Sequence, residues 1–244
     1  NDLTEAEHDM FFLFGNKSSN YLESKNRNKK IEEYNNNIKG FDGWKNFDDM
    51  FSFINESTNY VVLRNYEEID SINANDSDID FLTKDKNFSY HINGFKKHKS
   101  KARSAYDVKI GNTNYSADIR HLSDGYYDSR WVNDIVKNRV LYKDRFFIPY
   151  PEDEFFSLLY HSLIHKNKMS NKYLKKLTYL SEKNNLNHDI DLLKTRQGAF
   201  EILDQYMNDK KYKITFPNDY SVQFNYTNKG IKRWIWEAIG KIKD

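Results

Sequence analysis

The hydrophobic period of this chain changes twice, and that change constrains the fold more than any other feature of the sequence. Residues 1–58 carry apolar side chains at helical spacing, residues 59–150 contain short runs typical of strands, and the helical period returns from Pro151 onward. We therefore expect an α+β protein in three parts. They are a helical N-terminal segment (1–58), a small mixed-sheet α/β core (59–150) and a mostly helical C-terminal subdomain (151–244).

The same patterns predict the individual elements. In the first part we expect helices over 4–14 and from Asp42 or Asn46 onward. In the core we expect strands over 60–63, 78–82, 106–110 and 114–121, a turn at 111–113, a helix over 129–139 and a hairpin over 140–148. In the last part we expect helices over 151–166, 171–184 and 189–207, a strand pair at 214–216 and 222–226, and a helix over 228–242.

Composition excludes several classes of protein. The 244 residues include 38 Lys+Arg and 36 Asp+Glu, a balance that argues against nucleic acid as a partner. No cysteine is present, which excludes a disulfide scaffold, a zinc ribbon and thiol catalysis. No apolar run approaches the roughly 20 residues of a membrane span, and no signal peptide is visible. We expect a cytoplasmic protein, and because the chain begins at Asn1 we expect one domain of something longer.

Three aspartates carry the chemical argument. Asp78 and Asp80 are two apart on an expected strand, so their side chains leave the same face and repel unless a cation lies between them. Asp118 falls on a later strand and offers a third carboxylate. Hard oxygen ligands of this kind suit Mg²⁺ or Mn²⁺ beside a phosphate ester. An Asp-x-Asp pair also arises by chance in an acidic chain, usually in a solvated loop, and its position within a strand favours the metal site.

The order of these segments resembles the polymerase-β-like nucleotidyltransferase superfamily. The resemblance covers roughly residues 59–121 and rests on the runs Val61-Val62-Leu63-Arg64-Asn65, Ser77-Asp78-Ile79-Asp80-Phe81-Leu82, Gly94-Phe95 and Ala117-Asp118-Ile119-Arg120. It looks closest to the glycan-associated branches, near the fukutin-related and choline-phosphate transferases. The resemblance implies that Asp78 and Asp80 are metal ligands and that Asp118 is the third ligand or the general base.

One position departs from the superfamily pattern. The superfamily usually carries a Gly-Ser pair after the first strand, where backbone amides hold nucleotide phosphates, but here that place reads Leu63-Arg64-Asn65-Tyr66. Arg64, with Asn65 beside it, is a candidate replacement because a guanidinium group matches phosphate oxygens bidentately. The departure leaves an unusual donor open. Arg120 and His121, directly after the third carboxylate, are expected to face the same cleft.

Further candidates lie outside the resemblance. His161 and His165 are spaced i, i+4 on an expected helix, so they share a face. No Glu follows His161, which argues against a zinc-protease site, and core packing is the simpler role. The functional alternative has His161, His165 and Lys166 contacting a phosphate or a sugar. The basic run over 96–103 could meet phosphates or RNA, but such runs are more often solvated connectors.

These observations lead to one function and two alternatives. The leading hypothesis is a metal-dependent transferase that moves a nucleotidyl, phosphoryl-linked or nucleotide-activated sugar group onto a sugar or glycan acceptor. The first alternative is a glycosyltransferase that holds a nucleotide-sugar donor through the Asp-x-Asp motif. The second alternative is a catalytically inactive nucleotidyltransferase-fold binding module, which the missing Gly-Ser pair favours and the three acids oppose.

Overall fold

The computed structural model describes residues 39–74, 78–98, 104–166, 169–186 and 189–226, and the helices expected over 4–14 and 228–242 lie outside these residues. The described chain contains helices and a mixed five-stranded sheet, which confirms the α+β class. In chain order the elements are α3 (Phe47–Ser57), β1 (Tyr60–Val62), η2 (Tyr66–Ser71, a 3₁₀ helix), β2 (Asp78–Thr83), α4 (Phe88–His91), β3 (Phe95–Lys96), β4 (Ala105–Ile110), β5 (Thr113–His121), α5 (Ser129–Lys137), β6 (Val140–Tyr142), β7 (Phe146–Ile148), α6 (Pro151–Ile164), α7 (Asn171–Lys183), η3 (Ile190–Lys194, also 3₁₀) and α8 (Arg196–Lys210).

The sheet has the strand order β1-β2-β5-β4-β3, and β6 and β7 form a separate hairpin. β2 and β5 run parallel, while every other neighbouring pair is antiparallel. The hairpin expected between 106 and 121 is confirmed, with a loop one residue shorter than expected because Thr113 already pairs with Ile110. Gly111 begins that loop with φ +58°, a positive φ typical of tight hairpin turns. The edge strand β3 was not predicted, because two residues are too short to show an alternating pattern.

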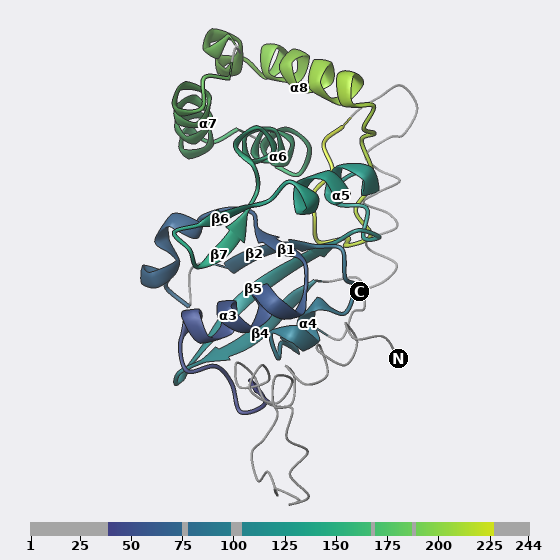
Figure 1. Cartoon of the computed structure of the whole chain (residues 1–244). Helices are drawn as coiled ribbons and strands as arrows, with labels where there is room; N and C mark the ends of the chain where they lie inside the picture. The colour runs from purple at the N-terminus through teal and green to yellow at the C-terminus, as the bar shows by residue number, and fades with distance from the viewer. Residues whose placement is uncertain (1–38, 75–77, 99–103, 167–168, 187–188, 227–244) are drawn as a thin grey trace, which may run out of the picture.

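The two faces of the sheet differ as the alternation predicts. Ile79 and Phe81 of β2 pack into a core shared with α3 and α4, whereas Asp78 and Asp80 leave the opposite face. β1 is buried on both faces, and its Val61 belongs to a second core formed with α5, α6, α7 and α8. Figure 1 shows α6, α7 and α8 gathered at the end of the molecule away from α3 and α4.

Local sequence signals explain where the predicted helices begin. Asn46 caps α3, its side chain accepting a hydrogen bond from the Asp49 backbone N–H, so this helix begins after Asn46 and not at Asp42. Pro151 occupies the first turn of α6, where its missing N–H costs nothing. α6 contacts both α7 and α8, and its side chains are buried almost throughout. Its acids and histidines are therefore buried as well.

One predicted helix is divided. Residues 189–207 were expected to form a single helix, but the structure has η3 and then α8, separated at Thr195. Thr195 adopts an extended conformation, and its side chain accepts a hydrogen bond from the Gly198 backbone N–H, which begins a new helix. A Cβ at Gly198 would lie 2.5 Å from the carbonyl oxygen of Leu192, so the turn between the two helices depends on this glycine.

The strand pair expected at 214–216 and 222–226 is wrong. Residues 212–226, which we call the C-terminal strap, contain no strand. The strap's backbone groups bind other parts of the molecule: Thr215 N–H donates to Tyr160 Oη, Asn218 N–H to the Asp124 carbonyl and Asn225 N–H to the Ile164 carbonyl. Alternating apolar side chains along the strap pack against the helical core, which imitates a strand pattern.

Among the described helices, none is both long enough and apolar enough to cross a membrane.

Candidate functional site

The aspartates expected to act together are brought together by the parallel pairing of β2 and β5. In that register Asp80 lies directly beside Asp118, and Asp78 lies beside Ser116. Neighbouring strands are about 4.8 Å apart, so Asp80 and Asp118 leave the same face as nearest neighbours. The alternation within each strand determines on which face its aspartate lies. The register between β2 and β5 depends on the tertiary structure, because the two strands are not adjacent in the chain.

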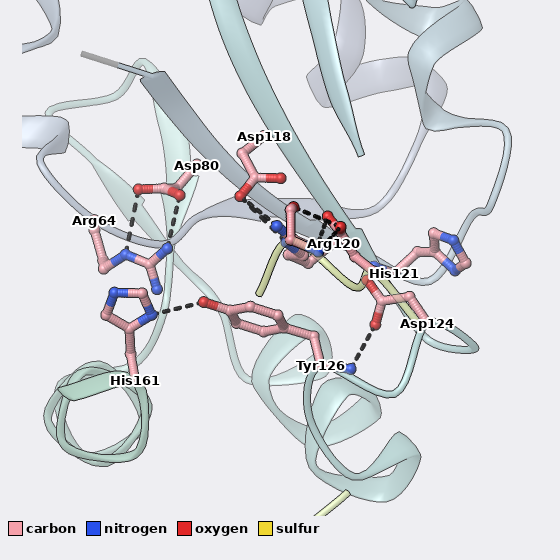
Figure 2. Close-up of polar contacts among 10 residues, drawn as sticks. Arg64, Asp80, Asp118, Arg120, His121, Asp124, Tyr126 and His161 are labelled. Carbon is pink, nitrogen blue, oxygen red and sulfur yellow. Dashed lines mark hydrogen bonds and ion pairs between the residues drawn. The ribbon is translucent and has the colours of Figure 1, made fainter. Parts of the chain in front are cut away.

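Arg64 binds Asp80 with both ends of its guanidinium group. Its Nη2 donates to Asp80 Oδ1 at 2.7 Å and its Nε to Asp80 Oδ2 at 3.2 Å (Figure 2). The third nitrogen, Nη1, is buried without a hydrogen-bond partner among the described residues. Burial opposes the charge of Arg64, but the neighbouring Asp80 holds its pKa well above its usual value. Arg64 is therefore a fixed cation with one free donor.

Arg120 binds two carboxylates at once. Its Nη2 donates to Asp118 Oδ2 at 2.7 Å, and its Nη1 donates to Asp219 Oδ2 at 3.1 Å. Its guanidinium carbon also lies 4.6 Å from the ring centre of Tyr126. Asp219 belongs to the C-terminal strap and is 3% exposed, so this ion pair joins the strap to the sheet.

Asp118 is only partly satisfied by these contacts. Its Oδ1 is buried and has no hydrogen-bond partner among the described residues. Burial raises the pKa of Asp118 to about 6, Arg120 opposes that rise, and the charge of Asp80 adds to it. A buried carboxylate oxygen without a donor is costly. This atom marks where a cation or a donating group from a ligand can bind.

The charges around the site do not balance. Four carboxylates lie around the two arginines: Asp80 pairs with Arg64, Asp118 and Asp219 pair with Arg120, and Asp124 feels the charge of Arg120. Two guanidinium groups, Arg64 and Arg120, oppose them. When all four acids are ionised, two negative charges remain, and Asp78 adds a further one at the exposed edge. This excess of negative charge attracts a divalent cation and repels an anion that carries no metal ion.

Two histidines of α6 complete the site from the opposite layer. His161 Nδ1 and Tyr126 Oη share a hydrogen bond of 2.6 Å, and His161 Nε2 lies 3.3 Å from Tyr173 Oη. Figure 2 shows His161 on the side of Arg64 away from Asp80. Burial and the charges of both arginines lower the pKa of His161 and of His165 well below the usual value. Both imidazoles are thus neutral at pH 7.

His165 is buried among rings. It is 2% exposed, its ring centre lies 4.0 Å from that of Tyr126, and neither ring nitrogen has a hydrogen-bond partner among the described residues. The structure therefore favours core packing for His165, whose ring lies against that of Tyr126. His161, by contrast, has polar contacts within the cluster.

The remaining predicted site residues do not converge on the cluster. Asp78 is exposed at the start of β2, and Lys166 is exposed just beyond α6. His121 points away from Asp80 and Asp118 in Figure 2. Asn65 has φ +56° and precedes η2, where its side chain makes no capping hydrogen bond. Asn tolerates this left-handed conformation, and Asn65 therefore turns the backbone after Arg64.

Sequence reasoning missed several members of the cluster. Tyr126, Asp124, Tyr173 and Asp219 were not among the predicted site residues. Asp124 binds the backbone N–H groups of His121 and Tyr126, a short-range pattern typical of an Asx turn that the sequence could have indicated. Asp219 offered no such signal, because its partner Arg120 is 99 residues away.

The donor atoms suit Mg²⁺ or Mn²⁺ in their chemistry, since carboxylate oxygens are hard ligands and the net charge is negative. In the described part of the chain, however, no three acidic or histidine side chains are gathered as a ready metal-ligand group. Arg64 takes both oxygens of Asp80, whereas Asp118 Oδ1 is free. A cation bound by Asp80 and Asp118 would therefore replace Arg64 as the partner of Asp80.

Comparisons of this chain with protein-family models, with curated proteins and with solved structures give no match.

Proposed function

We propose that this chain is a metal-dependent transferase that moves a nucleotidyl, phosphoryl-linked or nucleotide-activated sugar group onto a sugar or glycan acceptor. One observation carries the proposal: Asp80 and Asp118 lie side by side on parallel strands, and Asp118 Oδ1 is buried without a hydrogen-bond partner in the described part of the chain. Paired carboxylates with an unsatisfied oxygen and excess negative charge favour a bound divalent cation.

In this proposal Asp80 and Asp118 would hold Mg²⁺ or Mn²⁺, whose charge would neutralise the donor phosphates. Asp78, exposed at the start of β2, adds negative charge at the edge of the site. Once released from Asp80, Arg64 binds phosphate oxygens through the planar geometry that it now uses for the carboxylate. The alternative role of Asp118, outside the metal shell, is that of a general base that takes the proton from the acceptor hydroxyl, for which its raised pKa is suited. His161, neutral and hydrogen-bonded to both Tyr126 and Tyr173, holds these two hydroxyl groups in place without adding charge to the site.

A specific observation favours one alternative, the inactive binding module. Arg64 already donates to both oxygens of Asp80, which is the arrangement expected of a site that has lost its metal ion. The charge count opposes this alternative, because a metal-free site with two excess negative charges repels the phosphates that such a module would bind. The two hypotheses therefore differ in whether a nucleotide binds without a divalent ion.

The test is a thermal-shift and calorimetric panel on the full chain. Nucleoside triphosphates and nucleotide-sugars are added with Mg²⁺, with Mn²⁺ or with a chelator, to the wild type, Asp80→Asn and Asp118→Asn. Asp153→Asn is the matched control, because Asp153 is also a buried acid whose pKa is raised to about 6 but lies on α6, outside the cluster. Each protein is first checked for folding by circular dichroism.

We expect one ligand class to raise the melting temperature of the wild type and Asp153→Asn by roughly 5–10 °C at 100 times its Kd, only with metal. Asp80→Asn and Asp118→Asn should lose that shift. A triphosphate response indicates nucleotidyl transfer and a nucleotide-sugar response indicates glycosyl transfer. Metal-independent binding would favour the inactive module, and a flat panel in all four proteins would refute the metal site.

A further inference from the structure

A second cavity lies outside the aspartate cluster and is lined by tyrosines. It has a volume of about 410 Å³ and lies between η2, the β6–β7 hairpin and helices α6 and α7. Tyr66, Tyr142 and Tyr179 line it, and the rings of Tyr66 and Tyr142 meet edge to face with their centres 4.9 Å apart. Tyr179 is 53% exposed. The cavity thus combines a buried ring, a half-buried ring and an exposed ring.

The polar groups of this cavity carry charges of both signs. Glu67, Glu154 and Lys183 line it. Tyr66 Oη donates to Glu154 Oε2 at 2.7 Å, and Lys176 Nζ lies 3.0 Å from Glu67 Oε1 and 3.3 Å from Glu154 Oε1. Glu154 Oε1 is buried and lies against the Lys176 ammonium group as an ion pair. Two carboxylates and two ammonium groups leave no net charge.

Aromatic faces with balanced donors and acceptors suit a neutral ligand rich in hydroxyl groups. An ion gains little from a cavity without net charge, and a purely apolar ligand covers the polar groups of Glu67 and Lys183 without replacing their water. The apolar C–H face of a sugar ring can pack on tyrosine while its hydroxyls bond the carboxylate and ammonium groups. The chemistry of this cavity therefore matches a carbohydrate.

The cavity and the aspartate cluster share their supporting elements. Tyr66 follows Arg64 by two residues. On α6, Glu154 of the cavity and His161 of the cluster are seven residues apart, about 10 Å along the helix. α7 contacts both, because its Tyr173 approaches His161 and its Lys176 approaches Glu154. The cavity and the cluster are therefore neighbours on the same elements, and an acceptor bound in the cavity must extend beyond it to reach the cluster.

The geometry points to this tyrosine-lined cavity as a binding site for a neutral sugar, and to the sugar bound there as the acceptor of the transfer. The second half of this inference rests on the proposed function, whereas the first half does not. Sugar binding can therefore be measured without donor or metal, and its result stands apart from that of the nucleotide panel.

The experiment uses ligand-observed saturation-transfer NMR on the full chain, with a chelator and no nucleotide. The probes are glucose, galactose, N-acetylglucosamine and maltose, with tetramethylammonium as a cationic and glucuronate as an anionic counter-probe. The variants are Tyr179→Ala, which removes an exposed ring, and Glu154→Gln, which removes the buried charge. Tyr90→Ala is the matched control, because Tyr90 is also an exposed tyrosine and lies on α4, on the other side of the sheet.

We expect at least one neutral sugar to bind the wild type, and its Kd to rise tenfold or more in Tyr179→Ala and in Glu154→Gln. Tyr90→Ala should bind it as the wild type does. No response to any neutral sugar, or equal binding by both cavity variants, would overturn the inference, as would stronger binding of either counter-probe. Sugar binding in a protein that fails the nucleotide panel would support the cavity and refute its acceptor role.

Discussion

Two aspartates in different layers of this protein are both buried, but different groups stabilise their carboxylates. Asp118 on the sheet and Asp153 on α6 both have pKa values raised to about 6, in each case chiefly by burial. Asp153 Oδ1 accepts hydrogen bonds from Trp131 Nε1 and Tyr206 Oη, each at 3.2 Å. Asp118 is instead held by the charge of Arg120, and one of its oxygens has no donor.

This difference separates a structural acid from a candidate functional one. Neutral donors, Trp131 and Tyr206, bind Asp153 Oδ1 within the protein, with no ion pair to Asp153 among the described residues. Asp118 instead pairs with Arg120, which it shares with Asp219. Its Oδ1 receives no hydrogen bond among the described residues. A raised pKa therefore does not identify a ligand site by itself. What distinguishes the two acids is which groups donate hydrogen bonds to their carboxylate oxygens.

The largest expected effect comes from removing the shared cation. Arg120→Met leaves Asp118 and Asp219 buried without their partner and should lower the free energy of unfolding by about 3–5 kcal/mol. The measurement is urea denaturation in the presence of a chelator. Arg139→Met is the control, because Arg139 packs on Phe147 and donates to the Val136 carbonyl but has no ion pair among those in the described chain. If both variants lose equal stability, the cluster is not held together by charge.

An intermediate effect is expected from Asp153→Asn, and it depends on pH. The folded-state pKa of Asp153 lies above the ordinary 3.8, so folding favours the protonated form, and its contribution to stability is lost as pH rises from about 4 through 6. Asparagine keeps an acceptor for Trp131 and Tyr206 and cannot ionise. The variant should therefore gain stability relative to the wild type above pH 6, by at most about 3 kcal/mol.

Parallel urea titrations at pH 4 and pH 8 measure this difference. A stability difference between variant and wild type that is the same at both pH values would show that Asp153 ionises normally in the folded protein, and the comparison with Asp118 would fail.

The smallest expected effects come from two tyrosine hydroxyls. Tyr126→Phe removes the hydrogen bond to His161 and leaves a buried imidazole nitrogen unpaired, which should cost about 1–2 kcal/mol. Tyr206→Phe removes one of two donors to Asp153 and should cost about 0.5–1 kcal/mol. Thermal denaturation of both variants under identical conditions compares them. A larger loss in Tyr206→Phe would reverse the ranking of the two regions.

Much of the fold follows from local sequence patterns. The alternation of residues 78–82 predicted both the strand and the face on which Asp78 and Asp80 lie, and the helical period predicted α5, α6 and α7 to within about two residues. The strap was misread because alternating apolar residues fit a strand and also fit an extended segment packed on helices. Periodicity records which side chains are buried, and it does not record where the backbone hydrogen bonds go.

The sequence by itself determined that acids gather on one face of a strand and that apolar residues occupy the other, because side-chain direction in a strand is a local property. Only the tertiary structure decided that Asp80 stands beside Asp118, that Arg64 and Arg120 take these carboxylates, and that Asp219 reaches Arg120 from the strap. These pairings join residues far apart in the chain. They are selected when folding excludes water and each buried charge must find a partner.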